Sequence, residues 1–118
     1  MIKFITARIK SFGHAFSGIA KAFHGETHIK IHMLAVVVVC AAAVWLGVSG
    51  THWAILVLCM AAVISLEIAN TALERALDRL HPERHQSIGD AKDLMAGAVL
   101  VSAMASVIIA VLIFSQYF

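Results

Sequence analysis

The sequence predicts an all-α integral membrane protein, with an N-terminal amphipathic surface helix followed by three transmembrane helices. Of its 118 residues, 61% are hydrophobic and 14% are charged, whereas soluble domains carry about 25% charged residues. Lysine, arginine, aspartate and glutamate are absent from residues 31–66 and from residues 94–118. Residues 1–25 instead alternate basic and apolar side chains. This composition excludes a disordered chain and argues against a water-soluble domain.

Residues 1–25 form the predicted surface helix. Their apolar side chains recur at three- and four-residue intervals, the period of an amphipathic helix: Ile2, Ile5, Ile9, Phe12, Phe16, Ile19 and Phe23. We expect this helix to lie on the membrane with its basic face toward anionic head groups. The alternative is an amphipathic helix packed on a soluble core, but this chain lacks the composition for such a core.

The charge-free run of residues 31–66 is too long for one span, because the hydrocarbon core takes about 20 helical residues. The segment Gly47-Val48-Ser49-Gly50-Thr51-His52 breaks the run and suits a turn. We therefore expect spans at residues 31–48, 53–70 and 94–114, with a cytoplasmic segment at 71–93, all within a single domain of residues 1–118. All three spans must be α-helices, since backbone polar groups in lipid need internal partners.

The basic residues predict the orientation of the chain. Five of the nine lysines and arginines lie within the first 30 residues, and the other four lie between the second and third spans. The positive-inside tendency then makes the N-terminus and residues 67–93 cytoplasmic. The C-terminal tail is expected on the opposite side.

A polar stripe at the end of the second predicted span is the most informative feature. Glu67, Asn70, Thr71, Glu74 and Asp78 follow one another at offsets that keep them on one helix face. A carboxylate in hydrocarbon costs about 2.5–3.5 kcal/mol at the bilayer centre and less near the interface. One interpretation is the solvated face of a helix leaving the membrane. That interpretation explains Asp78 but not Glu67 and Asn70, so the stripe favours a functional site.

Further polar residues at the same boundary indicate which site this is. Glu26 stands where the surface helix meets the first span, so Glu26 and Glu74 could converge on one cation. Magnesium is the expected ion, because it takes one or two carboxylates together with substrate phosphates. Lys92 and Asp93 open the third span and could contact a nucleotide, although the sequence has no Walker-type phosphate loop. The residues alone thus predict a magnesium–phosphate site beside lipid.

The motifs around these residues resemble the prokaryotic diacylglycerol kinase family, small three-span membrane kinases that include the undecaprenol kinases. The resemblance covers nearly the whole chain in register. Its matching pieces are Glu26, Ile29-Lys-Ile-His32, Glu67-x-x-Asn70-Thr-Ala-x-Glu74-x-x-x-Asp78, Pro82-Glu-Arg-His85, Ala91-Lys-Asp93 and Ala96-Gly-Ala-Val-Leu100. It implies ATP- and Mg²⁺-dependent phosphorylation of a membrane lipid alcohol. It also implies a homotrimer with shared active sites in the bacterial inner membrane, and no nucleic-acid partner.

The resemblance also implies roles for individual residues. Glu67 would be the catalytic base beside the lipid hydroxyl, with Asn70 assisting catalysis and Ala96 near the lipid substrate. Glu26 and Glu74 would hold magnesium on the ATP phosphates. The other positions implied to contact the nucleotide are His14, Asp78, Glu83, Arg84, His85, Lys92 and Asp93. His14 stands where some relatives have a tyrosine, and Ala7 stands where an arginine is expected.

Two questions stay open at the level of sequence. The lipid could be undecaprenol or 1,2-diacylglycerol, with undecaprenyl phosphate or phosphatidic acid as the product. The motifs Ile29-Lys-Ile-His32 and Pro82-Glu-Arg-His85 modestly favour the polyprenol. The alternative function is a proton-coupled small membrane transporter subunit, or a scaffold, in which Glu67 carries the proton. Such a protein has no need for Asn70 and Glu74 on the same side.

Overall fold

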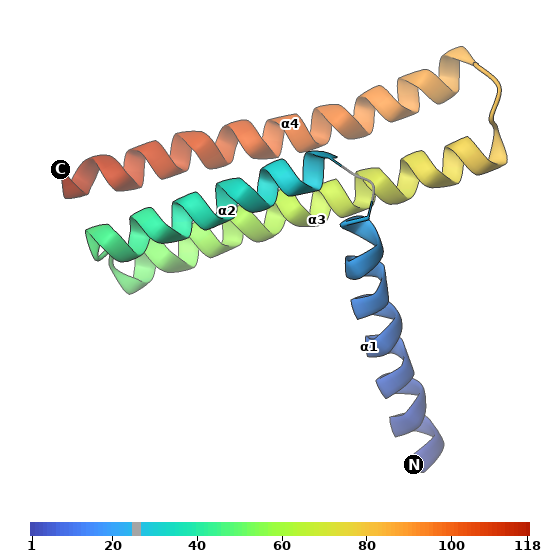
Figure 1. Ribbon diagram of the computed structural model, residues 1–118, viewed down its shortest axis with the longest axis horizontal. Coiled ribbons are helices and arrows are strands. Elements are labelled where there is room, and N and C mark those ends of the chain that lie inside the picture. Colours follow the sequence, from blue (N-terminus) through green and yellow to red (C-terminus); the bar gives the residue numbers. More distant parts are fainter. Residues whose placement is uncertain (25–26) are drawn as a thin grey trace.

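The computed structural model describes residues 1–24 and 27–118 and is built from helices (Figure 1). The described residues form α1 (Ile2–Ala22), α2 (Thr27–Leu46), α3 (Gly50–Leu80), α4 (Gln86–Phe114) and a short 3-10 helix η1 (Ser115–Tyr117). Helices α2, α3 and α4 are each long and apolar enough to cross a membrane. The predicted fold class is therefore confirmed.

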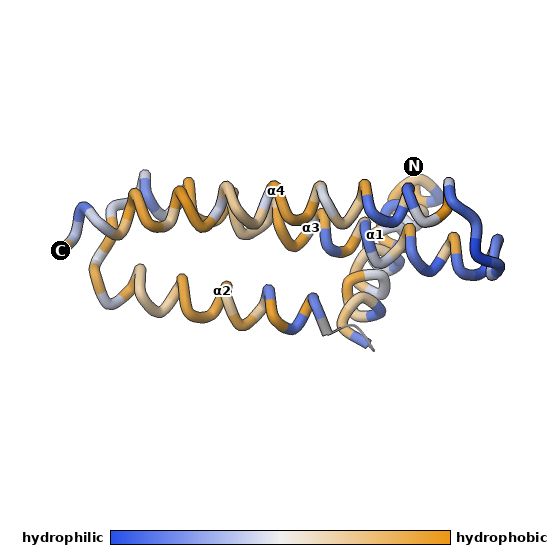
Figure 2. The backbone as a smooth tube through the Cα atoms, turned by 90° about the horizontal axis from the view of Figure 1, so that it is seen from above, coloured by the Kyte–Doolittle hydropathy of each residue, from blue (hydrophilic) through white to orange (hydrophobic). Residues whose placement is uncertain are grey.

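α2, α3 and α4 run alongside one another as an incomplete bundle. α3 packs most extensively against α4 and less extensively against α2, while α2 and α4 make few contacts. Figure 2 shows this arrangement from above, with α3 and α4 superposed and α2 set apart from them. We call the end of the bundle where α2 turns into α3 the turn end, and the end where residues 81–85 join α3 to α4 the loop end. Hydrophilic residues gather at the loop end (Figure 2).

The turn end is closed by a glycine-dependent helix cap. Gly47 has φ +64°, a left-handed conformation that glycine adopts without steric cost. The Val48 N–H donates to the Ala43 carbonyl and the Gly47 N–H donates to the Val44 carbonyl, each at 3.2 Å. This pair of bonds is the Schellman motif, which satisfies carbonyls that a helix end leaves without partners. The sequence Gly47-Val48 thus ends α2 and reverses the chain.

The buried apolar cluster lies beside this turn. It consists of Ala43, Val48, Leu56 and Ile113, contributed by α2, the turn, α3 and α4. The Tyr117 hydroxyl adds polar contacts, because it accepts the Ser49 N–H at 2.9 Å and lies 2.6 Å from His52 Nδ1. The turn end therefore joins all three long helices and the C-terminal η1 segment.

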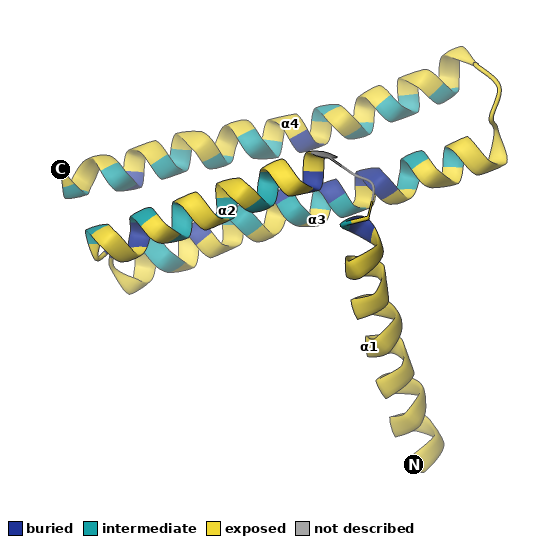
Figure 3. Cartoon of the chain, viewed as in Figure 1, coloured by how far each residue is buried: buried dark blue, intermediate teal, exposed yellow. Residues whose placement is uncertain are grey.

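α1 projects away from the bundle and contacts it through α3 near the α1 C-terminus (Figure 1). Except for Ala22 and its neighbour Phe23, its side chains are exposed, as the yellow ribbon of Figure 3 shows. The Arg75 guanidinium of α3 donates to the carbonyls of Lys21 and His24, at 3.2 and 3.0 Å. Arg75 thereby gives two carbonyls at the end of α1 a side-chain donor from α3 and holds this helix to the bundle.

α3 and α4 are longer than the predicted spans. α3 continues to Leu80, beyond residue 70, because residues 71–80 are rich in alanine, leucine, glutamate and arginine, which favour helix in water. α4 begins at Gln86, ahead of residue 94, since the His85 side chain accepts the Ser87 N–H and caps the helix. A run of residues without charges shows how far the apolar sequence extends. It does not show where the helix begins or ends, because a helix can continue into water.

Candidate active site

One face of α3 carries the candidate site. Leu56 and Val63 are buried on this face near the turn end, and the face continues toward the loop end with buried polar residues. Glu67 is 2% exposed, Asn70 is 5% exposed and Thr71 is 4% exposed. The polar stripe expected from the sequence is therefore on the inner side of α3, and its first members are more deeply buried than a solvated helix face would be.

Glu67 lies opposite His32 of α2. His32 Nε2 is 3.5 Å from Glu67 Oε2, and the two side chains are 22% and 3% exposed. A buried carboxylate needs a hydrogen-bond or charge partner, because leaving it without one costs several kcal/mol. α2 supplies such a partner at the level where the apolar part of α3 ends.

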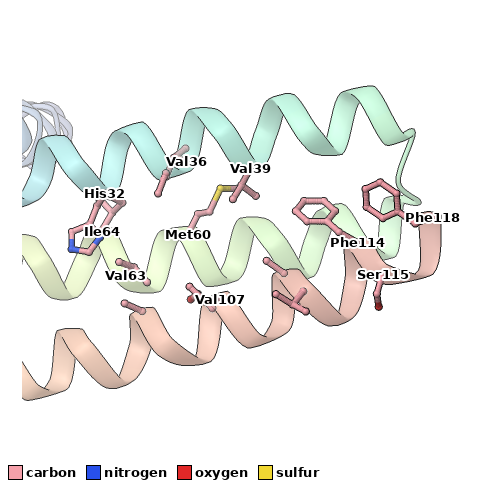
Figure 4. A pocket seen from close by; sticks show the side chains of 15 residues that line it. His32, Val36, Val39, Met60, Val63, Ile64, Val107, Phe114, Ser115 and Phe118 are labelled. Atoms are coloured by element: carbon pink, nitrogen blue, oxygen red, sulfur yellow. The ribbon is translucent and has the colours of Figure 1, made fainter.

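An apolar groove leads to this pair along the bundle. Its volume is about 530 Å³, and it lies between α2 and α4 with part of α3 as its floor. Figure 4 shows His32 at one end of the groove and Phe114, Ser115 and Phe118 at the other. The remaining walls are mostly valine, alanine, isoleucine and methionine side chains. This lining suits an alkyl chain.

One turn beyond Glu67, Asn70 and Glu74 form a second polar pair. Asn70 Nδ2 donates to Glu74 Oε1 at 3.5 Å. Asn70 Oδ1 is buried and has no hydrogen-bond partner among the described residues. Native proteins seldom leave such a buried oxygen without a partner, and a bound water or ion commonly fills that place.

A polar cavity of about 470 Å³ lies at the loop end, on the water-exposed side of the stripe. Lys92 forms an ion pair with Asp78 and so joins α4 to α3 there. Most of the predicted nucleotide contacts line this cavity: Asp78, Glu83, Arg84, His85, Lys92 and Asp93. Asp78 follows Glu67 by eleven residues, or about 16 Å along the axis of α3. Glu74 lies between them.

The structure does not bring every predicted residue to this region. Glu26 lies outside the described residues. His14 is exposed in the middle of α1, away from the loop end (Figure 1). Ala96 is exposed on α4, and it is absent from the described groove lining, whose α4 part begins at Ala103.

Glu74 and Asn70 are the described residues that best suit a magnesium ion. No three histidine, cysteine, aspartate or glutamate side chains cluster closely enough among residues 1–24 and 27–118 to hold an ion alone. Magnesium usually takes only one or two carboxylates and completes its shell with water and phosphate oxygens. The Glu74 carboxylate beside the unpartnered oxygen of Asn70 fits that requirement.

From the sequence, His32 has no assigned role beside Glu67, although the residue lies within the motif Ile29-Lys-Ile-His32. A signal was present, since His32 and His52 are the two histidines inside the charge-free run of residues 31–66. Arg75, which the sequence pattern places on no candidate site, binds the end of α1. Both roles depend on contacts between helices.

The fold and the site define a small three-span membrane protein whose buried carboxylate, Glu67, contacts a residue at the end of an apolar groove, with a polar cavity further along α3. A family model described as "Prokaryotic diacylglycerol kinase" matches residues 13–114. The chain belongs to this family and is a lipid kinase, as the sequence motifs predict.

Three characterised relatives illustrate the similarity. The chain is 37% identical over 105 residues to the undecaprenol kinase of Bacillus subtilis, covering 89% of this chain and 85% of the relative. It is 32% identical over 103 residues to the diacylglycerol kinase of Escherichia coli K12, covering 87% and 84%. A diacylglycerol kinase of Synechocystis is 38% identical over 100 residues, covering 84% of this chain and 57% of that protein.

Proposed function

We propose that this protein transfers the γ-phosphoryl group of ATP to the hydroxyl of a membrane lipid alcohol, at the cytoplasmic face of the bacterial inner membrane. The observation that carries the proposal is the position of Glu67. This buried carboxylate contacts His32, which lines one end of the apolar groove, and it begins the polar stripe that runs toward the loop-end cavity. A lipid kinase needs this junction, because one substrate comes from the bilayer and the other from water.

The lipid tail occupies the groove between α2 and α4, so that its hydroxyl lies beside Glu67. The hydroxyl oxygen attacks the γ-phosphorus, the bond from this phosphorus to ADP breaks, and Glu67 takes the hydroxyl proton. Phosphoryl transfer requires little covalent chemistry from a protein, and its rate depends on alignment and charge neutralisation. The deep burial of Glu67 and its 3.5 Å separation from His32, a residue of the groove lining, support this role.

Glu74 and Glu26 would hold Mg²⁺, and Asn70 and Asp78 would support the bound ion. Magnesium supplies charge neutralisation on the ATP phosphates. Lys92, Asp93 and the loop residues Glu83, Arg84 and His85 contact the nucleotide, and their shared cavity supports this assignment. His14 is the last residue that we propose to contact the nucleotide. It lies on α1, apart from the residues that line the loop-end cavity. Ala96 lies near the path of the lipid.

A homotrimer completes the site. α1 projects from its own bundle (Figure 1), so the His14 of one subunit can reach the nucleotide of another. Most residues of the three long helices also remain exposed, as the yellow surfaces in Figure 3 show, which supports burial against further copies or lipid. The clustering of basic residues supports a cytoplasmic N-terminus.

Undecaprenol is the preferred lipid of this proposal, and undecaprenyl phosphate is then the product. Its support is the pair of motifs around His32 and His85, together with the similarity to the Bacillus subtilis enzyme, which is named undecaprenol kinase. The alternative lipid is 1,2-diacylglycerol, which would give phosphatidic acid. The relatives named diacylglycerol kinase support this second candidate.

The test is phosphate transfer from radiolabelled ATP by the purified protein in detergent–lipid micelles. Undecaprenol and diacylglycerol are offered separately, each with Mg²⁺ and with a chelator. We expect Mg²⁺-dependent transfer, faster to undecaprenol. Faster transfer to diacylglycerol would reverse the choice of lipid. No transfer to either lipid by folded protein would overturn the proposal and favour the proton-coupled transporter or scaffold.

A further inference from the structure

The contact between His32 and Glu67 carries an inference that rests on the proposed function of Glu67. His32 is the one titratable residue in the described lining of the apolar groove, and its Nε2 lies 3.5 Å from Glu67 Oε2. Figure 4 shows the imidazole at the end of the groove, next to Ile64 of α3. A histidine that served only to bridge two helices would not need to line the substrate groove as well.

We propose that His32 is the positioning residue of the lipid kinase site. In its Nε2–H tautomer, the imidazole donates a hydrogen bond to Glu67 Oε2 and fixes the carboxylate in one rotamer. The second carboxylate oxygen then remains available for the lipid hydroxyl. A general base must lie within about 2.6–3.2 Å of the proton donor, so a freely rotating carboxylate would lose much of its effect.

The local structure of α2 makes His32 a rigid support. Ile29 is fully buried one turn before it, on the same face of α2. Packing of Ile29 against the bundle therefore fixes the backbone that carries the imidazole. The 3.5 Å separation is longer than an optimal N–H···O hydrogen bond. Hydrogen bonds at catalytic sites commonly tighten when the substrate binds.

The arrangement also determines which substitutions should preserve the role. The interaction requires one N–H donor at the distance of Nε2 and does not require a permanent charge. Glutamine at position 32 supplies an amide N–H of similar reach, whereas alanine supplies no donor. His28 is exposed one turn earlier on α2 and provides a matched control.

The experiment first establishes lipid phosphorylation by the unmodified protein, since absent activity would reject the proposed function and not the role of His32. Activity, kcat and the KM for ATP are then measured for His32→Ala, His32→Gln and His28→Ala. We expect His32→Ala to lower kcat about 10- to 100-fold, as for the loss of comparable supporting contacts, with the KM for ATP unchanged. His32→Gln should recover most of the loss, and His28→Ala should behave like the unmodified protein.

A double-substitution cycle separates positioning from mere stabilisation. If His32 acts through Glu67, adding His32→Ala to Glu67→Gln should change the residual rate less than about twofold. Equal multiplicative losses in both backgrounds would overturn the proposal. So would an unchanged kcat in His32→Ala, or failure of His32→Gln to recover activity while the protein remains as thermally stable as the unmodified one.

Discussion

The two ends of the helical bundle are built on different principles. At the turn end, polar groups have partners within the chain: the carbonyls at the end of α2 accept bonds across Gly47, and Tyr117 contacts Ser49 and His52. Toward the loop end, in the second half of α3, Asn70 Oδ1 is buried without a partner among the described residues. The carboxylates there line a cavity instead of a packed core.

This difference separates stability from function along one bundle. The turn end contains the apolar cluster and an internally satisfied cap, which favour one packing of α2, α3 and α4. The loop end keeps polar atoms available for ligands, at a cost in folding free energy. Functional sites are commonly where a protein departs from optimal local packing. Substitutions at the loop end should therefore affect activity, and substitutions at the turn end should affect stability.

Glu67→Gln should produce the largest effect. The substitution keeps the size of the side chain but removes the proposed proton acceptor, so lipid phosphorylation should fall about 10²- to 10⁴-fold. Initial rates of phosphate transfer measure the loss, and equilibrium binding of ATP provides the control. Weak ATP binding with little loss in the rate of transfer would assign Glu67 to the nucleotide site instead.

Asn70→Leu should separate activity from stability. We expect lipid phosphorylation to fall about 10- to 100-fold, because Glu74, the proposed magnesium ligand, loses the hydrogen bond from the Asn70 amide. The free energy of unfolding should stay constant or rise by about 1 kcal/mol, since an unpartnered buried oxygen is removed. Thermal unfolding in detergent, followed by circular dichroism, measures stability. A less stable protein with full activity would show that Asn70 serves packing.

The sequence predicts the fold well and the site in part. Charge-free runs locate three spans, and helical spacing puts Glu67, Asn70 and Glu74 on one face. The partner of Glu67 could not be predicted, because helical periodicity fixes faces within a helix but not how two helices cross. The contact of Arg75 with the end of α1 could not be predicted for the same reason, since it also depends on how two helices are placed. The loop residues were assigned by resemblance, and the fold explains why they gather where α3 and α4 are joined.

Tyr117→Phe should have a smaller effect, confined to the turn end. Loss of the hydroxyl leaves the Ser49 N–H and the His52 ring without this contact. The expected decrease in the free energy of unfolding is about 1–2 kcal/mol. Lipid phosphorylation measured well below the unfolding temperature should be unchanged. A large loss of activity in a stable variant would mean that the two ends are coupled.

Arg75→Ala should have the smallest effect, on the attachment of α1. Without the guanidinium, the His24 carbonyl loses the Arg75 donor and the Lys21 carbonyl keeps only backbone donors, so the end of α1 should open more often. We expect trypsin to cleave after Lys21 about three- to tenfold faster, as mass spectrometry of timed digests would measure. Arg79→Ala, an exposed arginine one turn later on α3, is the matched control. Equal rates of cleavage after Lys21 in Arg75→Ala and Arg79→Ala would show that Arg75 does not hold α1 to the bundle.

The sparse contact between α2 and α4 has a consequence for enzyme kinetics. The groove extends along the apolar spans, and groove residues such as Val107 and Val111 remain largely exposed, as they would be toward lipid. A lipid that enters the groove laterally from the membrane stays within the membrane throughout the reaction. Its effective concentration is then its mole fraction in the membrane, not its amount per volume of solution. Adding inert phospholipid at a fixed total of substrate should therefore slow the reaction by surface dilution alone.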